Sequence, residues 1–395
     1  MPIASLSTGH GDRMRRRIAC RYVTLVIYIV THMSRIVLIG AGHTHIELAR
    51  RSAEFVAGGH EIVLVNPYRS HPYSGMGPGL LAGTYSLADV MLPAASLVEQ
   101  GGGRFVADSV AGLDPERNRI ELEGGATIDY DVVSFNLGSE PVADTSGDHV
   151  YPVKPINTLA VLRHAIEQRS LSAATIRVGV IGGGPGGVEL AANSAHLLDA
   201  LRVAEPRIDL YTSDNPLAGV SGAREAYVER RLHAAGVRIH RRCRTTPAEV
   251  DADFVLVAPG IRPPGVTKQL GLPLSEDGGI LIDRYLRSTA YPNVFAVGDC
   301  ATYPEGPLDR VGVYAVRMQS LLAHNLRQST RSSGADDGGL KPFTATHKYL
   351  AGFNLGFGRG LLYRGRWTIR GRPAFLLKDR IDRGFMRRYR DAAGG

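Results

Sequence analysis

Two stretches of the chain share one pattern: a short apolar run, a glycine turn, and then apolar positions at helical spacing. In the first stretch, the run at 36–39 is typical of a strand buried in a parallel sheet. Gly40-Ala41-Gly42 follows it, and a helical segment leads to a second apolar run at 62–65. This order of strand, turn, helix and strand is that of a mononucleotide-binding unit.

The same order returns in the middle of the chain. An apolar run at 176–181 leads into the glycine-rich turn 182–187, a helical segment follows, and 208–211 supplies the next strand. Two such units predict two dinucleotide sites. The fold class that follows is α/β, with two Rossmann-like dinucleotide-binding domains and a small α+β C-terminal domain.

The segments around the two units indicate how the domains are divided. Short strands and turns at 105–137 are typical of a meander that completes the first domain. Two strand-then-glycine segments, 131–141 and 253–264, could each return the chain from one domain to the other. The serine- and glycine-rich stretch 329–339 is typical of a linker. We therefore expect a first domain at 33–150 and 279–330, a second domain at 151–278, and a tail domain at 341–395.

The N-terminal stretch 1–32 has features of a short signal peptide. Three arginines at 15–17 precede an apolar run at 22–31, but the run is too short to span a bilayer and no small-residue cleavage site follows. Met33 stands directly before the first predicted strand. We expect Met33 to be the biological start and 1–32 not to belong to the natural protein, which mass spectrometry of the natural N-terminus would test.

Composition places the chain among ordinary soluble proteins. Its 395 residues allow two or three domains, and 44% hydrophobic with 21% charged residues is a usual balance. Cys20, Cys243 and Cys300 are far apart and form neither a metal-binding nor a disulfide pattern. This cysteine usage favours a reducing, cytoplasmic compartment.

Charge adds a second feature, because much of the net charge of +8 lies after Arg359. Such a basic tail suggests membrane headgroups or an acidic partner, or it is a solvated helix face; we expect no nucleic acid partner. The predicted helix at 373–390 carries Leu377, Ile381 and Phe385 four residues apart. This apolar stripe could lie on the cytoplasmic face of a membrane or pack on its own tail domain.

The two glycine motifs differ in regularity. Gly182, Gly184 and Gly187 match GxGxxG in full and follow a strand, which favours a dinucleotide site over a merely tight turn. In the first motif Gly40 and Gly42 are in place, but His45 occupies the third position, so helix and strand should pack less closely there. Asn66 stands at the end of the second strand, where an acid often binds the adenosine ribose. By itself the first motif would be a weak nucleotide site.

Seven short motifs, taken in order, resemble the FAD-dependent pyridine nucleotide oxidoreductases. From Met33 onward they read GAGHTH, YSGMGPGLLAG, NLGSEP, GGGPGGVEL, VAPGIRPP, FAVGDCA and GVYAVRMQ. The resemblance covers nearly the whole chain from Met33. It points in particular to the type II NADH dehydrogenase-like flavoproteins, the branch also found fused to selenide, water dikinase. It implies FAD in the first domain, NAD(P)H in the second, and electron transfer from NAD(P)H through FAD to a second acceptor.

For the FAD site, the resemblance implies that Gly40 and Gly42 hold the pyrophosphate and that Asp299 bonds the ribityl hydroxyls. The alternative for Asp299 is a helix N-cap, and no charge partner for it is visible in the sequence. His43 and His45 should pack near the FAD rather than bind a metal. The loop 72–83, with Ser74 and Gly75, should lie against the isoalloxazine. Further candidates are Asn66, Lys154 at the flavin edge or in solvent, and Gly138 and Gly260 in the domain-crossing turns.

For the second site, the resemblance places Glu189 near the nicotinamide, although a first-turn helix acid is the alternative. Asp214 follows the next strand with no arginine beside it, which favours NADH over NADPH without settling the coenzyme. Tyr314 is a candidate for lining the acceptor face, where Val313 and Arg317 replace the glutamines of type II NADH dehydrogenases.

The acceptor itself stays open. Three functions fit the sequence: an NAD(P)H oxidoreductase with a quinone or other small acceptor, a soluble reductase of a protein such as ferredoxin, and a flavoprotein sensor. Disulfide reduction is disfavoured, because the family's pair of redox cysteines after the first helix is missing. A homodimer is a further possibility.

Overall fold

The computed structural model describes residues 33–142, 146–258, 260–303, 305, 308–330, 338–346 and 348–394. The N-terminal stretch 1–32 and most of the expected linker 329–339 lie outside these residues, so what the sequence suggests about them stays a prediction.

The first dinucleotide unit forms a sheet of five parallel strands in the order β18-β9-β1-β2-β5. Its central strands are buried over the apolar runs 36–39 and 62–65, as expected of strands covered on both faces. Strand β18 joins this sheet from far along the chain, beside β9. The elements of this lobe are β1 (Arg35–Ile39), α2 (His43–Arg50), α3 (Ser52–Ala57), β2 (Glu61–Val65), α6 (Ala94–Gln100), β5 (Arg104–Val106), β9 (Val132–Phe135), β18 (Val294–Ala296), η4 (Gly298–Cys300) and α10 (Gly312–Ser329).

Smaller strands complete this lobe. The expected meander within 105–137 is an antiparallel sheet of three strands, and β5 and β9 on either side of it belong to the parallel sheet. The small elements are β6 (Val110–Asp114), β7 (Arg119–Leu122), β8 (Thr127–Asp129), η3 (Gly265–Gln269), β17 (Ile280–Leu281) and β19 (Ala301–Thr302).

The second unit forms its own parallel sheet, in the order β11-β15-β12-β13-β14. Ile181, Tyr211 and His240 stand in register at the carboxyl ends of three neighbouring strands. This edge is therefore where the glycine-rich turn and the loops after β13 and β14 meet. The elements are β11 (Val150–Pro152), α7 (Thr158–Ser170), β12 (Thr175–Ile181), α8 (Pro185–Ala200), β13 (Glu205–Tyr211), α9 (Gly222–Ala234), β14 (Val237–His240), η2 (Pro247–Glu249) and β15 (Phe254–Val257).

The two strand-then-glycine segments do cross between the lobes, and they cross side by side. β10 (Glu140–Pro141) pairs antiparallel with β16 (Ile261–Arg262). An ion pair of 2.9 Å between Glu140 and Arg262 joins them.

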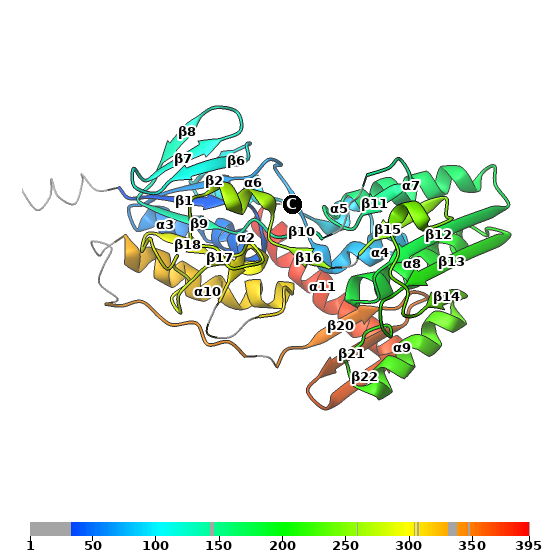
Figure 1. Ribbon diagram of the computed structural model, residues 1–395. Helices are drawn as coiled ribbons and strands as arrows, with labels where there is room; N and C mark the ends of the chain where they lie inside the picture. Colours follow the sequence, from blue (N-terminus) through cyan, green and yellow to red (C-terminus); the bar gives the residue numbers. More distant parts are fainter. Residues whose placement is uncertain are drawn as a thin grey trace, which may run out of the picture.

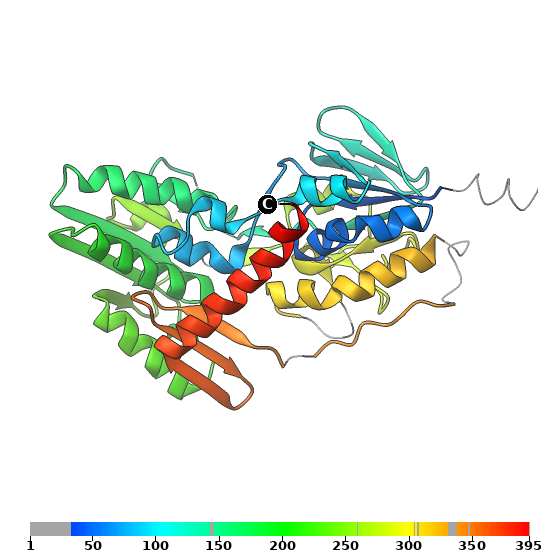
Figure 2. The ribbon, with the colours of Figure 1, turned by 180° about the vertical axis from the view of Figure 1, so that it is seen from behind.

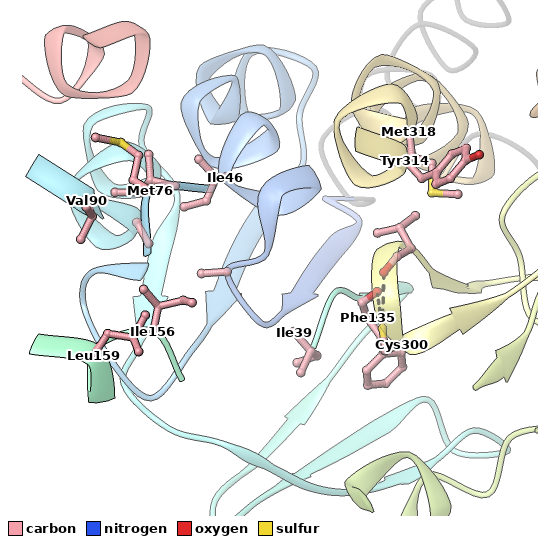
Figure 3. Packing of buried hydrophobic residues seen from close by; sticks show 14 of the residues in the cluster. Ile39, Ile46, Met76, Val90, Phe135, Ile156, Leu159, Cys300, Tyr314 and Met318 are labelled. Carbon is pink, nitrogen blue, oxygen red and sulfur yellow. Dashed lines mark hydrogen bonds between the residues drawn. The ribbon is translucent and has the colours of Figure 1, made fainter. Parts of the chain in front are cut away.

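The segment after β2 reaches from the first lobe to the second. It contains β3 (His71–Pro72), η1 (Ser74–Met76), α4 (Gly77–Leu81), α5 (Leu87–Val90) and β4 (Met91–Leu92). Figure 3 shows Met76 and Val90 on the same side of the view as Ile156, just before α7, and Leu159 in the first turn of α7. A Cβ atom at Gly77 would lie 3.2 Å from the side chains of Ile156 and Leu159, so the two lobes are packed closely here.

The tail domain is an antiparallel sheet followed by one long helix. The sheet of β20 (Ala351–Asn354), β21 (Gly360–Arg364) and β22 (Trp367–Gly371) lies on the second lobe, beside α8 and α9, and α11 (Arg372–Ala392) runs from it to the first lobe (Figures 1 and 2). Arg388 at the far end of α11 pairs with Glu47 of α2 at 2.7 Å.

The predicted apolar stripe on this helix is therefore not one buried face. Phe385 stacks on Tyr73 of the first lobe, whereas Ile381 is 45% exposed. The side chains that are buried on α11 include polar ones, among them Asp382 and Tyr389. The helix packs across both lobes because these polar groups find partners there, so the expectation that it packs on its own tail domain was incomplete.

Candidate functional site

The second glycine motif has the geometry of a phosphate-binding turn. Gly182 has φ 120°, and a Cβ atom at Gly187 would lie 1.8 Å from the carbonyl oxygen of Gly182, so only glycine fits these two positions. A Cβ atom at Gly184 or Gly186 would meet no atom within 4 Å. Packing therefore does not require glycine there, and the outer face of the turn is open to a ligand. Gly184 caps α8 without a side-chain hydrogen bond, which leaves the helix N-terminus able to bind an anion.

The loop after β13 lies against this turn. Leu217 N donates to Gly183 O at 2.8 Å, and the Thr212 side chain packs on Gly183. The Asp214 carboxylate accepts a hydrogen bond from the N–H of the next residue, Asn215, at 2.8 Å. Thr212 is thus the side chain at the end of β13 that stands nearest the glycine turn.

The first glycine motif is supported by two asparagines. Gly40 has φ 84°, and a Cβ atom there would lie 2.6 Å from Asn136 O. The Asn136 side chain accepts from Thr44 N at 3.1 Å at the start of α2 and donates to Val297 O at 2.9 Å. Asn66 accepts from Ala41 N at 3.0 Å and donates to Tyr68 O at 2.6 Å. Both amides hold the turn in place.

His45 takes the third position of this motif through hydrogen bonds. Its Nδ1 donates to Gly40 O at 2.7 Å and its Nε2 accepts from the Ser134 hydroxyl at 2.9 Å. Burial lowers the pKa of His45 to about 4, so the ring is neutral. A glycine at this position would let the helix α2 pack closer to the sheet. The His45 imidazole instead occupies the space between α2 and the strands.

Asp299 has a charge partner, which the sequence did not reveal. Lys154 Nζ lies 3.2 Å from the Asp299 carboxylate, and the Ser139 hydroxyl donates to the same carboxylate at 2.7 Å. The view that Lys154 is solvated is therefore wrong: its side chain is three-quarters buried. Gly138, next to Ser139, has φ 72° and open space where a Cβ would be. Gly260 has φ 146° and accepts from Val142 N at the paired crossing strands.

Tyr314 and Asp299 line one pocket, together with Gly298, Arg310 and Val311. Tyr314 is itself buried, and its hydroxyl donates to Thr346 O at 3.3 Å. The neighbouring Cys300 is buried, and its thiol faces Phe135 O and Val297 O (Figure 3). Burial raises the pKa of this thiol to about 11, so Cys300 is a packing residue.

His43 lies at the contact between the first lobe and α11. Its ring meets Tyr73 edge-on at 5.3 Å between centroids, and Tyr73 stacks on Phe385 at 4.7 Å. Burial lowers the pKa of His43 to about 4 and that of His71 to about 3, so both rings are neutral. The described residues contain no group of three or more histidine, cysteine or acidic side chains that could hold a metal.

Glu189 belongs to a buried charged cluster where the two lobes and α11 meet. It lies beyond the first turn of α8, so the alternative of a dipole-stabilised first-turn acid is wrong. Its carboxylate accepts from Asn354 N at 2.6 Å. Burial raises the pKa of Glu189 to about 7, although the charge of Lys378 acts in the opposite direction.

Lys378 of α11 is the cation of this cluster. It lies 2.7 Å from Asp382 and donates to Gly75 O, in the loop after β3, at 2.8 Å. Burial alone would lower the pKa of Lys378, but the carboxylates of Asp382 and Glu189 raise it above its usual value. Tyr73, next to Ser74 and Gly75, donates to Asp382 at 3.2 Å. The expected flavin-facing loop and Glu189 are thus joined through α11.

Sequence reasoning missed Asn136, Lys378 and Asp382. Asn136 could have been suspected, since it is a polar residue that directly follows a buried strand. Lys378 and Asp382 are four residues apart on a predicted helix, an ion-pair spacing, but nothing local marked them as buried.

Comparison with known proteins decides the family. The model of the pyridine nucleotide-disulphide oxidoreductases matches residues 34–320. The chain belongs to this family. It is 24% identical over 294 residues to the NADH dehydrogenase-like protein YutJ of Bacillus subtilis, covering 70% of this chain and 79% of that protein. It is 22% identical to a type II NADH:quinone oxidoreductase of Staphylococcus saprophyticus, covering 88% of this chain and 94% of that protein.

Solved structures share the fold of this pyridine nucleotide-disulphide oxidoreductase. The sulfide:quinone oxidoreductase of Aquifex aeolicus superposes with a TM-score of 0.76 at 18% identity, covering 91% of this chain and 92% of that one. NDH2 of Plasmodium falciparum in complex with NADH gives a TM-score of 0.69 at 12% identity, covering 90% and 97%. The predicted fold class and family are confirmed. The chain is an FAD-dependent NAD(P)H oxidoreductase.

Proposed function

We propose that this enzyme passes electrons from NAD(P)H through FAD to a quinone-like acceptor, which takes up protons as it is reduced. The observation that carries the proposal is the cluster of Glu189, Lys378 and Asp382. A quinone reduced by two electrons also takes up two protons, whereas an iron–sulfur protein takes up electrons alone. A carboxyl group with a pKa of about 7 beside a buried ammonium suits proton delivery at neutral pH.

The roles of the site residues follow from their positions. Gly40, Gly42 and the start of α2 would hold the FAD pyrophosphate, and Asp299 with Lys154 would meet its ribityl chain. Three side chains would support the FAD site without holding the pyrophosphate themselves: His43, His45 and Asn66. Ser74 and Gly75 would lie at the isoalloxazine, Tyr314 would line the pocket beside Asp299, and Gly138 and Gly260 would allow the crossing turns. Gly182, Gly184 and Gly187 would hold the NAD(P)H pyrophosphate, with Asp214 near its adenosine.

Bound FAD would supply hydride acceptance from NAD(P)H and onward electron transfer. The chain's own residues would orient the two rings and hold a proton on Glu189. The Lys378 ammonium would keep the neighbouring carboxylates from repelling each other. Glu189 lies on α8 and Lys378 on α11. The Asn354 N–H, in β20, holds the Glu189 carboxylate in position by donating a hydrogen bond to it. The resemblance to the branch fused with selenide, water dikinase stays a prediction from the sequence.

The test compares two acceptors on the same preparation. A soluble quinone takes protons and ferricyanide takes none, so Glu189→Gln should lower quinone turnover about a hundredfold, as expected for loss of a general acid. Ferricyanide turnover should stay within about twofold. Asp199→Asn, an exposed acid on the same helix, is the control and should change neither. Equal loss with both acceptors would refute a role in proton delivery, and turnover with ferredoxin but not with quinone would refute the proposed acceptor.

We further propose that the tail domain contacts a membrane surface peripherally. No helix in the described residues is long and apolar enough to cross a membrane. However, Trp367, Leu376 and Ile381 are 53%, 53% and 45% exposed, on a tail rich in arginine. Exposed aromatic and aliphatic side chains among cations suit an anionic lipid surface. The cytoplasmic location and the homodimer stay predictions from the sequence.

Vesicle pelleting tests this contact. The protein should sediment with vesicles that contain anionic lipid and not with neutral ones. Leu376→Ser with Ile381→Ser should reduce the bound fraction several-fold. Leu171→Ser, at an 80% exposed position on the second lobe, is the control and should leave binding unchanged. If both sets of variants bound equally, the tail would not be the contact.

A further inference from the structure

The turn after β14 lies against the end of β13, at the edge of the second sheet that carries the glycine turn. Thr212 N donates to His240 O at 2.9 Å, and Cys243 N donates back to Thr212 O at 3.0 Å. Residues 241–244 therefore sit one strand spacing from Thr212. This turn is some thirty residues further along the chain, so the sequence around Asp214 did not reveal its arginines.

Several cations near this edge are already paired. Asp209 accepts from Arg238 at 2.5 Å and from His240 at 2.6 Å, and Arg241 pairs with Glu229. Arg242 and Arg244 are different. Both are exposed, and neither forms an ion pair with an acidic side chain in the described part of the chain.

The end of β13 lacks the carboxylate that suits an unphosphorylated ribose. In dinucleotide-binding units an acid there accepts a hydrogen bond from the adenosine 2′-hydroxyl, whereas a nearby arginine accommodates a 2′-phosphate. Here the strand ends at Tyr211 and Thr212 follows it, and Tyr211 stacks on His240 at 4.6 Å between ring centroids. The carboxylate of Asp214 binds the N–H of the following residue. Thr212 is buried, and its hydroxyl carries no negative charge and accepts from Asp214 N at 3.3 Å.

We propose that Arg242 and Arg244 form a subsite for the 2′-phosphate of NADPH. The inference rests on the proposed function, because it assumes that the second glycine motif binds the coenzyme. If the pyrophosphate binds at the turn after β12 and the adenosine ribose at the end of β13, the loop after β14 would be the neighbouring loop that could meet a 2′-phosphate, because it packs beside Thr212. Guanidinium groups bind phosphate through paired, charge-assisted hydrogen bonds. NADPH is then the preferred electron donor.

Kinetics with an acceptor other than quinone test the preference. With ferricyanide, kcat/KM should be higher for NADPH than for NADH. Arg242→Gln and Arg244→Gln should each lower the NADPH value about tenfold and change the NADH value less than twofold. Arg207→Gln is the matched control: Arg207 is exposed on β13 but at the opposite edge of the sheet. A wild-type preference for NADH, or equal losses for both coenzymes, would overturn the inference.

Binding supplies a readout that needs no turnover. Calorimetry on the FAD-loaded enzyme should give tighter binding for 2′,5′-ADP than for 5′-AMP, and the difference should vanish in the double arginine variant. Equal binding of both nucleotides by the wild type would overturn the subsite. If NADPH reduced the flavin but no quinone were reduced, the quinone proposal would fail while this inference stood. If neither coenzyme reduced the flavin yet 2′,5′-ADP bound selectively, the phosphate subsite would still be supported.

Discussion

Replacing Glu189 by glutamine removes a group whose proton affinity differs between the folded and unfolded chain. Burial raises the pKa of Glu189 from 4.5 to about 7 in the folded enzyme. Between these values the folded state binds more protons than the unfolded state, so stability falls as the pH rises from about 4.5 to about 7. At 1.36 kcal/mol for each pKa unit, ionised Glu189 costs up to about 3 kcal/mol above pH 7. Glutamine keeps the shape of the side chain without this cost.

The assay is unfolding of both proteins by urea across pH 4 to pH 8. Glu189→Gln should match the wild type near pH 4 and gain in relative stability toward pH 8, by at most about 3 kcal/mol. Asp199→Asn serves again as the control and should show no such trend. A constant difference between Glu189→Gln and wild type over the whole range would show that Glu189 ionises as freely as in water, and the argument for its role in proton transfer would fall with it.

Two further predictions concern the glycine turn and the buried histidine. Gly187→Ala should destabilise the second lobe and abolish flavin reduction by NAD(P)H, since its Cβ would lie 1.8 Å from a backbone oxygen; Gly184→Ala should fold normally, because its Cβ meets nothing within 4 Å. Circular dichroism melting with anaerobic flavin bleaching separates the two, and equal melting temperatures would contradict the packing argument. The pKa of His45 is lowered from 6.5 to about 4. Because the unfolded chain then binds more protons, stability should fall as the pH drops from about 6.5 to about 4. His45→Gln should flatten this acid limb, and an unchanged limb in urea unfolding would show otherwise.

Local patterns predicted the fold well because each dinucleotide unit is encoded in one continuous stretch of sequence. The apolar runs at 36–39 and 176–181, each followed by glycines, are buried parallel strands with helices after them. The two crossing segments were also recognisable, since a strand ending in glycine is a local signal. No local signal showed that the two crossing segments pair with each other through β10 and β16. This pairing depends on how the two lobes pack together.

The site was harder to predict because its charges are matched across long sequence distances. Asp299 was expected without a partner, yet Lys154 comes from a segment 145 residues earlier. Glu189 was predicted to lie near the nicotinamide, but nothing in the sequence pointed to Lys378, which lies on the last helix, where the arginine-rich composition suggested a surface. Whether a lysine is buried is set by tertiary packing, and its sequence neighbours do not reveal it.

The last helix, α11, also restricts the relative motion of the two lobes. A hinged enzyme opens widely when a single flexible joint connects its parts, but here the paired strands β10 and β16 and the helix α11 span the gap together. Gln100 Nε2 even fastens the far end of the chain by donating to Ala393 O at 2.6 Å. Opening about a single hinge would therefore have to break contacts at two separate connections, the β10–β16 pair and the ion pair of Arg388 with Glu47.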